Sequence, residues 1–335
     1  MAGRAEIFLT GANGSVGKHF AAAALSAGFR VKGLVLPGED ARMLERLGVS
    51  VQRGRLEDRR SMEIASQGTT HAVHCASLLP HLSAMGRTAF ERVNVDAPRE
   101  MVRLGKERGW KRTIFLSSCG VLGRETTGPT TDETPYRRPF DLYTWSKIEG
   151  EKAVVEETSR LGVHTVLIRP ANVYGPGMLY KWPEVFELTS QGRMKTIGGG
   201  RVPFAVVHVR DLARAILAAL DEDRPISQGE RILVSSPEEL TFGEVLAIVA
   251  EKLGAPKPGN VPYVVALTAA YVARGLPPPL RLGRLKLLDP SAVREYRLGS
   301  RFDTSHAERA LGFRAQERFD RGIAEAIAAW REQFR

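Results

Sequence analysis

The chain has 335 residues, of which 43% are hydrophobic and 26% are charged, an ordinary globular composition that excludes a disordered or low-complexity protein. Its formal net charge is +10, but the Lys and Arg residues are scattered without a long basic block, which argues against a nucleic-acid-binding surface. Two cysteines exclude a disulfide framework and favour a cytoplasmic protein, and charged residues stand where a secretory leader would need an apolar run.

The first predicted strand, at residues 7–9, runs into a glycine-rich turn, and a helical pattern follows from residue 18 to about residue 27. In this context Gly11 permits a sharp turn, Gly14 lets a pyrophosphate approach the backbone, and Gly17 lets helix and strand pack closely. The N-terminus of the helix offers free N–H groups to the phosphates. The stretch therefore predicts a dinucleotide-binding turn.

Further predicted strands alternate with helical patterns through the first half of the chain. The strands are expected at 29–36, 49–52, 72–76, 113–118 and 163–168, and the helices at 41–47, 90–108 and 143–161. This alternation indicates an α/β fold with a Rossmann-type, doubly wound parallel sheet. Ligands should bind at the carboxyl ends of its strands.

The composition changes after about residue 172, where Gly and Pro become frequent. We expect a first domain over 1–172, to which a strand at 202–208 and a helix at 209–220 return. The remaining segments, 173–201 and 221–335, should form a smaller substrate-binding lobe, which ends in an amphipathic helix at 319–334 with a core-facing stripe.

One segment of this lobe, residues 261–273, is apolar but too short to span a bilayer. It is typical of an ordinary core helix. It would also suit the wall of an apolar pocket or peripheral contact with a membrane surface.

Three side chains carry acid–base chemistry. Tyr143 and Lys147 are four residues apart, so they share one face of the predicted helix. A nearby ammonium lowers the pKa of a phenol, and such a tyrosine exchanges a proton with an alcohol or ketone while hydride moves to or from a nicotinamide. Ser118 ends a predicted strand where ligands collect, and its hydroxyl is suited to hold the substrate oxygen.

In this order, these features resemble the extended short-chain dehydrogenases/reductases, the superfamily that includes nucleotide-sugar epimerases and dehydratases. The resemblance covers essentially the whole chain. Its motifs lie at residues 10–17, 74–77, 94–95, 117–123, 143 with 147, 169–177, 207–213 and 302–305. The C-terminal lobe is similar to the 3β-hydroxysteroid dehydrogenase-like and dihydroflavonol reductase-like branch.

The resemblance implies that Tyr143 is the general acid/base, that Lys147 holds the nicotinamide ribose, and that Ser118 orients the reacting oxygen. It implies cofactor contacts at Gly11, Asn13, Gly14, Ser15, Val16, Gly17, Leu36, Arg55, Leu56, Ala76, Ser77, Asn94, Tyr143, Lys147, Pro170, Asn172 and Val173. Substrate contacts are expected at Ser118, Cys119, Tyr143 and Asn172. No metal ligand is expected, and the resemblance implies a homodimer paired through the helices at 90–108 and 143–161.

Two departures from the family pattern leave the cofactor open between NAD and NADP. Val35 and Leu36 stand where relatives carry an acidic residue for the adenosine ribose, and Arg55 replaces an adenine-side aspartate. Glu39, Asp40 and Arg42 are further candidates for the adenosine end.

Three functions are compatible with the sequence. The first is an oxidoreductase for a bulky, hydrophobic, steroid-like alcohol or ketone. The second is a nucleotide-sugar epimerase or dehydratase that keeps its NAD bound. The third is a non-catalytic dinucleotide-binding protein, which the presence of both Tyr143 and Lys147 disfavours.

Overall fold

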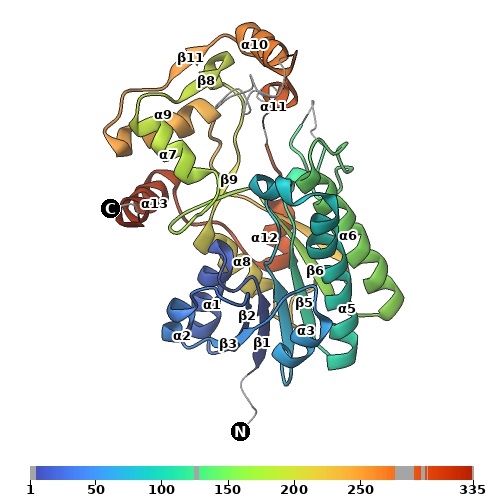
Figure 1. Ribbon diagram of the computed structural model, residues 1–335. Helices are drawn as coiled ribbons and strands as arrows, with labels where there is room; N and C mark the ends of the chain where they lie inside the picture. Colours follow the sequence, from blue (N-terminus) through green and yellow to red (C-terminus); the bar gives the residue numbers. More distant parts are fainter. Residues whose placement is uncertain (1–4, 124–127, 276–289, 296–298, 300, 334–335) are drawn as a thin grey trace.

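The computed structural model describes residues 5–123, 128–275, 290–295, 299 and 301–333. Within these residues the centre of the fold is a seven-stranded parallel sheet in the order β10-β6-β5-β4-β1-β2-β3 (Figure 1). The strands are β1 (Glu6–Thr10), β2 (Arg30–Val35), β3 (Ser50–Arg53), β4 (His71–His74), β5 (Arg112–Leu116), β6 (Thr165–Pro170) and β10 (Glu230–Val234). The predicted α/β fold class with a parallel, doubly wound sheet is confirmed, as are its six N-terminal strands.

Helices cover both faces of the sheet because its strands are apolar on both sides. Ile7 and Leu9 of β1 face one core, whereas Phe8 between them faces the other. The first core is closed by α1 (Ser15–Ser26), α2 (Arg42–Leu47), α8 (Val209–Ala219) and α12 (Ser305–Leu311). The second is closed by α3 (Arg59–Ala65), α5 (Ala97–Arg108) and α6 (Leu142–Leu161).

The expected domain boundary needs correction at two places. Strand β10 extends the central sheet by pairing with β6, and α12 packs in the same core, although both lie in the segment 221–335 that the sequence assigns to the second lobe. The expected strand at 202–208 appears as β9 (Val206–His208) and pairs with β7 (Asn172–Tyr174) outside the central sheet. Its helix, α8, does pack against α1.

The helix expected at 90–108 is interrupted. It consists of α4 (Arg87–Glu91), a π-helical turn at Arg92–Asp96 and α5. A Cβ on Gly150 of α6 would overlap the carbonyl oxygen of Asn94, so the missing side chain allows α6 to lie directly against this turn. The turn places Asn94 inside the protein, facing the helix that carries Tyr143 and Lys147.

The second lobe lies above the carboxyl ends of the central strands in Figure 1. Its described elements are α7 (Trp182–Ser190), β8 (Lys195–Ile197), α9 (Phe242–Leu253), β11 (Gly259–Val261), α10 (Tyr263–Gly275), α11 (Pro290–Glu295) and α13 (Phe319–Gln333). An aromatic core with Tyr174, Trp182, Phe186 and Phe319 joins several of them. The amphipathic helix expected at 319–334 is confirmed as α13.

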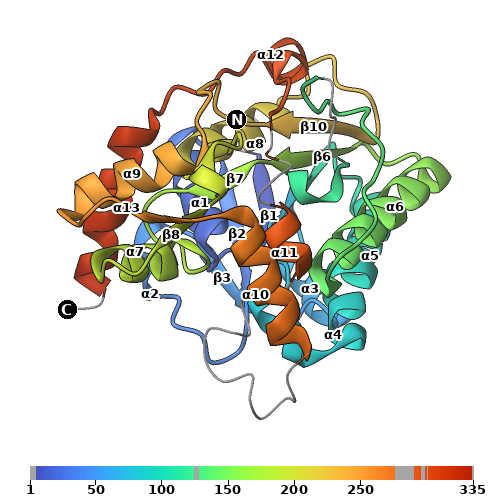
Figure 2. The ribbon, with the colours of Figure 1, turned by 90° about the horizontal axis from the view of Figure 1, so that it is seen from above.

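Helix α10 buries small side chains on its inward face. Its inward face carries the buried alanines Ala266, Ala270 and Ala273, and the first two pack with Val293 of α11. Seen from above, α10 and α11 lie side by side (Figure 2). Among the described residues, α10 and every other helix are too short or too polar to cross a membrane.

Candidate active site

A cavity of about 970 Å³ opens at the carboxyl ends of β1, β4, β5 and β6 and continues beneath segments of the second lobe. This is where a doubly wound sheet binds its ligands. The expected site residues that line it are Gly11, Asn13, Gly14, Ser15, Val16, Gly17, Leu36, Arg55, Leu56, Ala76, Ser77, Ser118, Cys119, Tyr143, Lys147, Pro170, Asn172 and Val173. Asn94 is the one expected residue outside this set.

The glycine-rich turn has the shape that a pyrophosphate requires. Gly11 adopts φ +66°, where a side chain would be strained, and a Cβ there would lie 2.6 Å from the Ala76 backbone nitrogen. A Cβ on Gly17 would overlap the carbonyl oxygen of Gly11, so the first turn of α1 packs directly on the loop. Gly14 is the N-cap of α1 and provides no capping side chain, which leaves the helix N-terminus open to an anion.

A buried acceptor also points to a ligand in this half of the cavity. Within the described part of the chain, Asn13 Oδ1 is buried and has no hydrogen-bond partner. The Nδ2 atom of the same side chain donates to Glu39 at 3.2 Å. The turn, the helix end and this acceptor fit a dinucleotide.

An acidic and a basic side chain both line the adenosine end of the cavity. Glu39 and Arg55 line it beside Leu36, whereas Asp40 and Arg42 pair with each other, their closest N–O distance being 2.6 Å. A carboxylate there suits a ribose diol and an arginine suits a 2′-phosphate. The cofactor therefore remains NAD or NADP.

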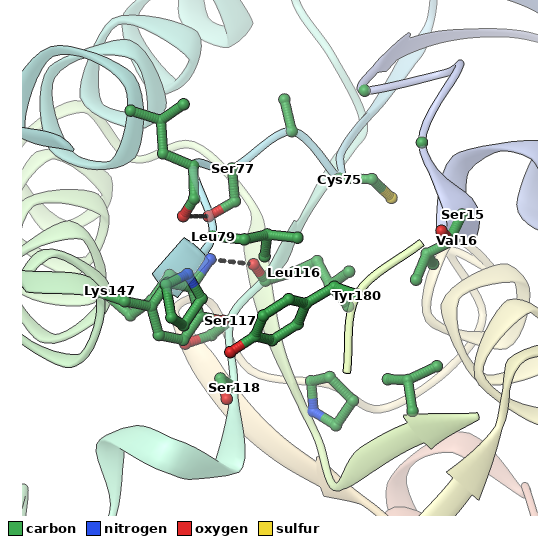
Figure 3. A pocket seen from close by; sticks show the side chains of 18 of the residues that line it. Ser15, Val16, Cys75, Ser77, Leu79, Leu116, Ser117, Ser118, Lys147 and Tyr180 are labelled. Carbon is green, nitrogen blue, oxygen red and sulfur yellow. Dashed lines mark hydrogen bonds between the residues drawn. The ribbon is translucent and has the colours of Figure 1, made fainter. Parts of the chain in front are cut away.

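The expected catalytic side chains lie in the part of the cavity opposite the adenosine end. Ser118 follows β5, and its Oγ accepts a hydrogen bond from the backbone N–H of Gly120 at 3.0 Å. A hydrogen bond with Ser118 acts on the Tyr143 phenol and favours its ionised form. Lys147, one turn further along α6, donates from Nζ to the carbonyl oxygen of Leu116 at 2.6 Å (Figure 3).

The electrostatics of this group differ from the sequence prediction. Withdrawal of the Tyr143 phenol from water raises its pKa above the usual range, and the hydrogen bond with Ser118 offsets only part of this effect. Burial also lowers the pKa of Lys147 to about 8. The pKa of the Tyr143 phenol is thus raised overall because desolvation dominates, and the Lys147 ammonium donates to the Leu116 carbonyl.

Asn94 does not line the cavity but forms hydrogen bonds with segments that do. Its Nδ2 donates to Ser146 Oγ on α6 at 2.9 Å and to the Leu78 carbonyl at 3.1 Å, while its Oδ1 accepts from the Leu78 N–H at 2.8 Å and from Ser77 Oγ at 3.2 Å. One buried amide thus ties the loop after β4 to the helix with Tyr143. Asn94 therefore lies behind the residues that line the cavity, although the family resemblance implies a cofactor contact at this position.

The opposite half of the cavity is mainly apolar. Its apolar side chains come from the loop after β4, the segment between β5 and α6, the segment before α7 with the first residue of α7, and the segment before α12. They are Leu78, Leu79, Pro80, Leu82, Met85, Leu122, Phe140, Met178, Leu179, Trp182 and Phe302. The side chain of Tyr180 extends into this space with its hydroxyl directed toward Ser118 (Figure 3), and its ring stacks on His81 with centroids 5.0 Å apart.

Two cations also line this half, Arg137 and Lys181. Lys181 Nζ donates to Asn172 Oδ1 at 2.9 Å, and its backbone adopts φ +70°, a strained conformation for a residue with a side chain. Sequence reasoning missed Tyr180, Lys181 and His81. The Gly175-Pro176-Gly177 run before Tyr180 and Lys181 predicts an irregular segment, but no pattern shows where such a segment lies.

The apolar segment at 261–273 is not part of this cavity. Of the described residues, those that line the cavity include none from α10. The interpretation that this segment forms the wall of an apolar pocket is therefore wrong, because its inward face packs on α11 instead. The apolar walls come from residues nearer the sheet.

Comparison with known proteins gives consistent results. The family model described as "NAD dependent epimerase/dehydratase family" matches residues 7–235. The chain is similar to sterol demethylase protein B of Methylococcus capsulatus, with 27% identity over 97% of this chain and 98% of that protein. It is similar to 3beta-hydroxysteroid-dehydrogenase/decarboxylase isoform 1 of Arabidopsis thaliana, with 27% identity over 84% of this chain and 68% of that protein.

Solved structures share the fold. The crystal structure of UDP-glucose 4-epimerase from Thermotoga maritima with UDP-glucose has a TM-score of 0.75 at 20% identity, and the match covers 98% of this chain and 100% of that one.

Proposed function

Because this chain belongs to the NAD-dependent epimerase/dehydratase family, we propose that it interconverts a bulky hydrophobic secondary alcohol and its ketone by hydride transfer with NAD or NADP. The chain is an NAD(P)-dependent enzyme of the extended short-chain dehydrogenase/reductase type. The class of its substrate and the roles of its individual side chains are what we propose.

The bound cofactor would supply or accept the hydride at its nicotinamide ring. Ser118 holds the reacting oxygen beside Tyr143, with which it shares a hydrogen bond. During alcohol oxidation the hydroxyl proton passes to the phenolate oxygen of Tyr143, and during ketone reduction the phenol returns it. Lys147, held against the end of β5, faces the nicotinamide ribose, and Asn94 keeps the helix and the loop after β4 in register.

The apolar wall of the substrate half is the observation that carries the proposal. Eleven apolar side chains line the same cavity as Ser118 and Tyr143, and a rigid hydrocarbon skeleton would bury its surface against them. The similarity to a sterol demethylase protein and to a 3beta-hydroxysteroid dehydrogenase/decarboxylase supports a steroid-like substrate.

A nucleotide-sugar epimerase or dehydratase is the second candidate. The cations Arg137 and Lys181 in the substrate half favour it, since they would meet a diphosphate. In that reaction the hydride returns to the same substrate, so the cofactor is not consumed.

Substitution of the proposed acid/base tests the mechanism. Tyr143→Phe should lower kcat by about 10²–10⁴-fold, the usual contribution of general acid–base catalysis, while leaving cofactor binding within a few fold. Tyr263→Phe, a tyrosine outside the cavity, is the matched control and should turn over like the wild type. Equal turnover by Tyr143→Phe and the wild type would remove Tyr143 from the reaction.

The homodimer and the cytoplasmic location stay predictions of the sequence. The helices expected to pair, α5 and α6, lie on one face of the sheet. The dimer can therefore be tested by comparing the sedimentation of the wild type with that of a variant that carries an introduced charge on this face.

A further inference from the structure

The outer face of α10 exposes large apolar side chains to solvent. Val264, Val265 and Val272 are 72%, 56% and 62% exposed, and Tyr271 is 46% exposed. Their spacing of one, seven and eight residues from Val264 places all four on one side of the helix. A helix that is apolar on its outer as well as its inner face is expected to be covered on both.

The outer face has no role in the cavity described above. The inner face of α10 packs on α11, and the helix lies at the end of the second lobe that is farthest from the central sheet (Figure 1). Exposed valines at such a place need a different explanation from substrate binding.

The stretch of chain that contains α10 is positively charged. Residues 254–275 contain Lys257 and Arg274 and no acidic residue. Arg294 of α11 lies against Tyr271, with its guanidinium carbon 5.7 Å from the ring centroid. An apolar face with cations beside it is complementary to an anionic lipid surface.

We propose that the outer face of α10 docks on the surface of an anionic lipid bilayer, with Val264, Val265 and Val272 entering the interface and the neighbouring cations meeting lipid phosphates. A second copy of the chain fits this face less well. Four side chains cannot supply the roughly 800 Å² per partner that a stable dimer buries, and symmetry would bring like charges together.

Vesicle sedimentation with the full-length protein tests the proposal. The wild type should pellet with phosphatidylcholine vesicles that contain about one third phosphatidylglycerol, much less with pure phosphatidylcholine, and less again at about 0.5 M salt. Val264→Glu/Val272→Glu should weaken binding to the anionic vesicles by about tenfold or more. Ile64→Glu is the matched control, because Ile64 is 58% exposed on α3, away from α10, and this variant should bind like the wild type.

Melting curves and cofactor binding should be alike in all variants, since α10 contributes no described residue to the cavity. If the glutamate pair disturbs folding, Val264→Ser/Val272→Ser removes the apolar surface without adding charge and should also weaken binding. Wild-type protein that ignores anionic vesicles, or a folded double variant that binds them as well as the wild type, would overturn the proposal. So would a dimer in solution that the double variants dissociate, since the face would then belong to a second copy.

Discussion

At the scale of single residues, the environment of Tyr143 determines how the reaction should respond to pH. Desolvation raises the pKa of its phenol, so the group is protonated at neutral pH and is ready to donate a proton to a ketone. Alcohol oxidation needs the phenolate, whose population increases tenfold per pH unit below that pKa. We therefore expect kcat/KM for alcohol oxidation to rise steadily from pH 7 through pH 9, whereas that for ketone reduction should stay nearly level.

Initial rates in both directions across this pH range provide the measurement. An oxidation rate that is already level at neutral pH would mean that the phenol ionises far more easily than its surroundings indicate.

Cofactor choice is a second residue-scale question. Glu39 and Arg55 both line the adenosine end, and their charges act oppositely on a 2′-phosphate. Glu39→Gln should shift the ratio of kcat/KM values toward NADP, and Arg55→Gln should shift it toward NAD, each by roughly three- to tenfold because both side chains are exposed. Parallel assays with the two cofactors measure the ratio, and Arg42→Gln serves as the control because Arg42 pairs with Asp40. Ratios that do not move would exclude both side chains from the adenosine site.

At the scale of elements, the contact between α6 and the π-helical turn at Arg92–Asp96 positions the site. A Cβ on Gly150 would overlap the Asn94 carbonyl oxygen, a backbone atom that cannot move aside alone. Gly150→Ala should therefore destabilise the protein by about 1–3 kcal/mol, the usual effect of overpacking, and should lower kcat by displacing Tyr143. Gly128→Ala is the control, since nothing lies within 4 Å of a Cβ there. Urea unfolding and turnover of both variants test this, and a Gly150→Ala protein as stable as the wild type would contradict the close contact.

The same elements show what the sequence can and cannot predict. Strands β1 to β6 are predictable because most are short apolar runs between turn residues and all of them alternate with helical patterns. Helical spacing continues through residues 90–108, so periodicity gives no sign of the π-helical turn, which depends on the contact with Gly150. Strand β10 follows α8 in the chain, but its place beside β6 is a long-range pairing that local pattern does not encode.

The residues of the candidate site also fall into predictable and unpredictable groups. The glycine-rich turn, Ser118, Tyr143 and Lys147 are predictable because their residue types and spacing follow from their chemistry. Tyr180 and Lys181 reach the cavity from an irregular segment whose course is set by contacts such as Ser15 Oγ donating to the Gly177 carbonyl at 2.8 Å. Such contacts join residues far apart in the sequence.

At the scale of the whole molecule, a histidine links three distant segments. His306 of α12 is 2.9 Å from Asp132 through Nδ1 and 2.8 Å from Glu230 of β10 through Nε2. Partial burial lowers the pKa of His306, but the hydrogen bonds and charges of the two carboxylates outweigh it and raise the pKa above its usual value. The folded state therefore binds this proton more tightly than the unfolded state does.

The stabilisation by His306 should be fully present below its unfolded pKa of about 6.5 and should be lost as the pH rises through the raised folded value. The difference in unfolding free energy between the wild type and His306→Gln should accordingly shrink on going from pH 6 to pH 9. Urea unfolding at a series of pH values measures it. A difference that grows with pH would have the wrong sign for a raised histidine pKa.

For the whole molecule, we expect net redox chemistry on a hydrophobic alcohol. The most direct test adds NAD or NADP and a 3β-hydroxysteroid to the purified protein and compares the near-ultraviolet absorbance of reduced cofactor with the amount of ketone formed. We predict one reduced cofactor per ketone, with the signal lost in Tyr143→Phe. Absence of steroid turnover, together with conversion of UDP-glucose without any net change in cofactor absorbance, would contradict the claim and establish epimerisation instead.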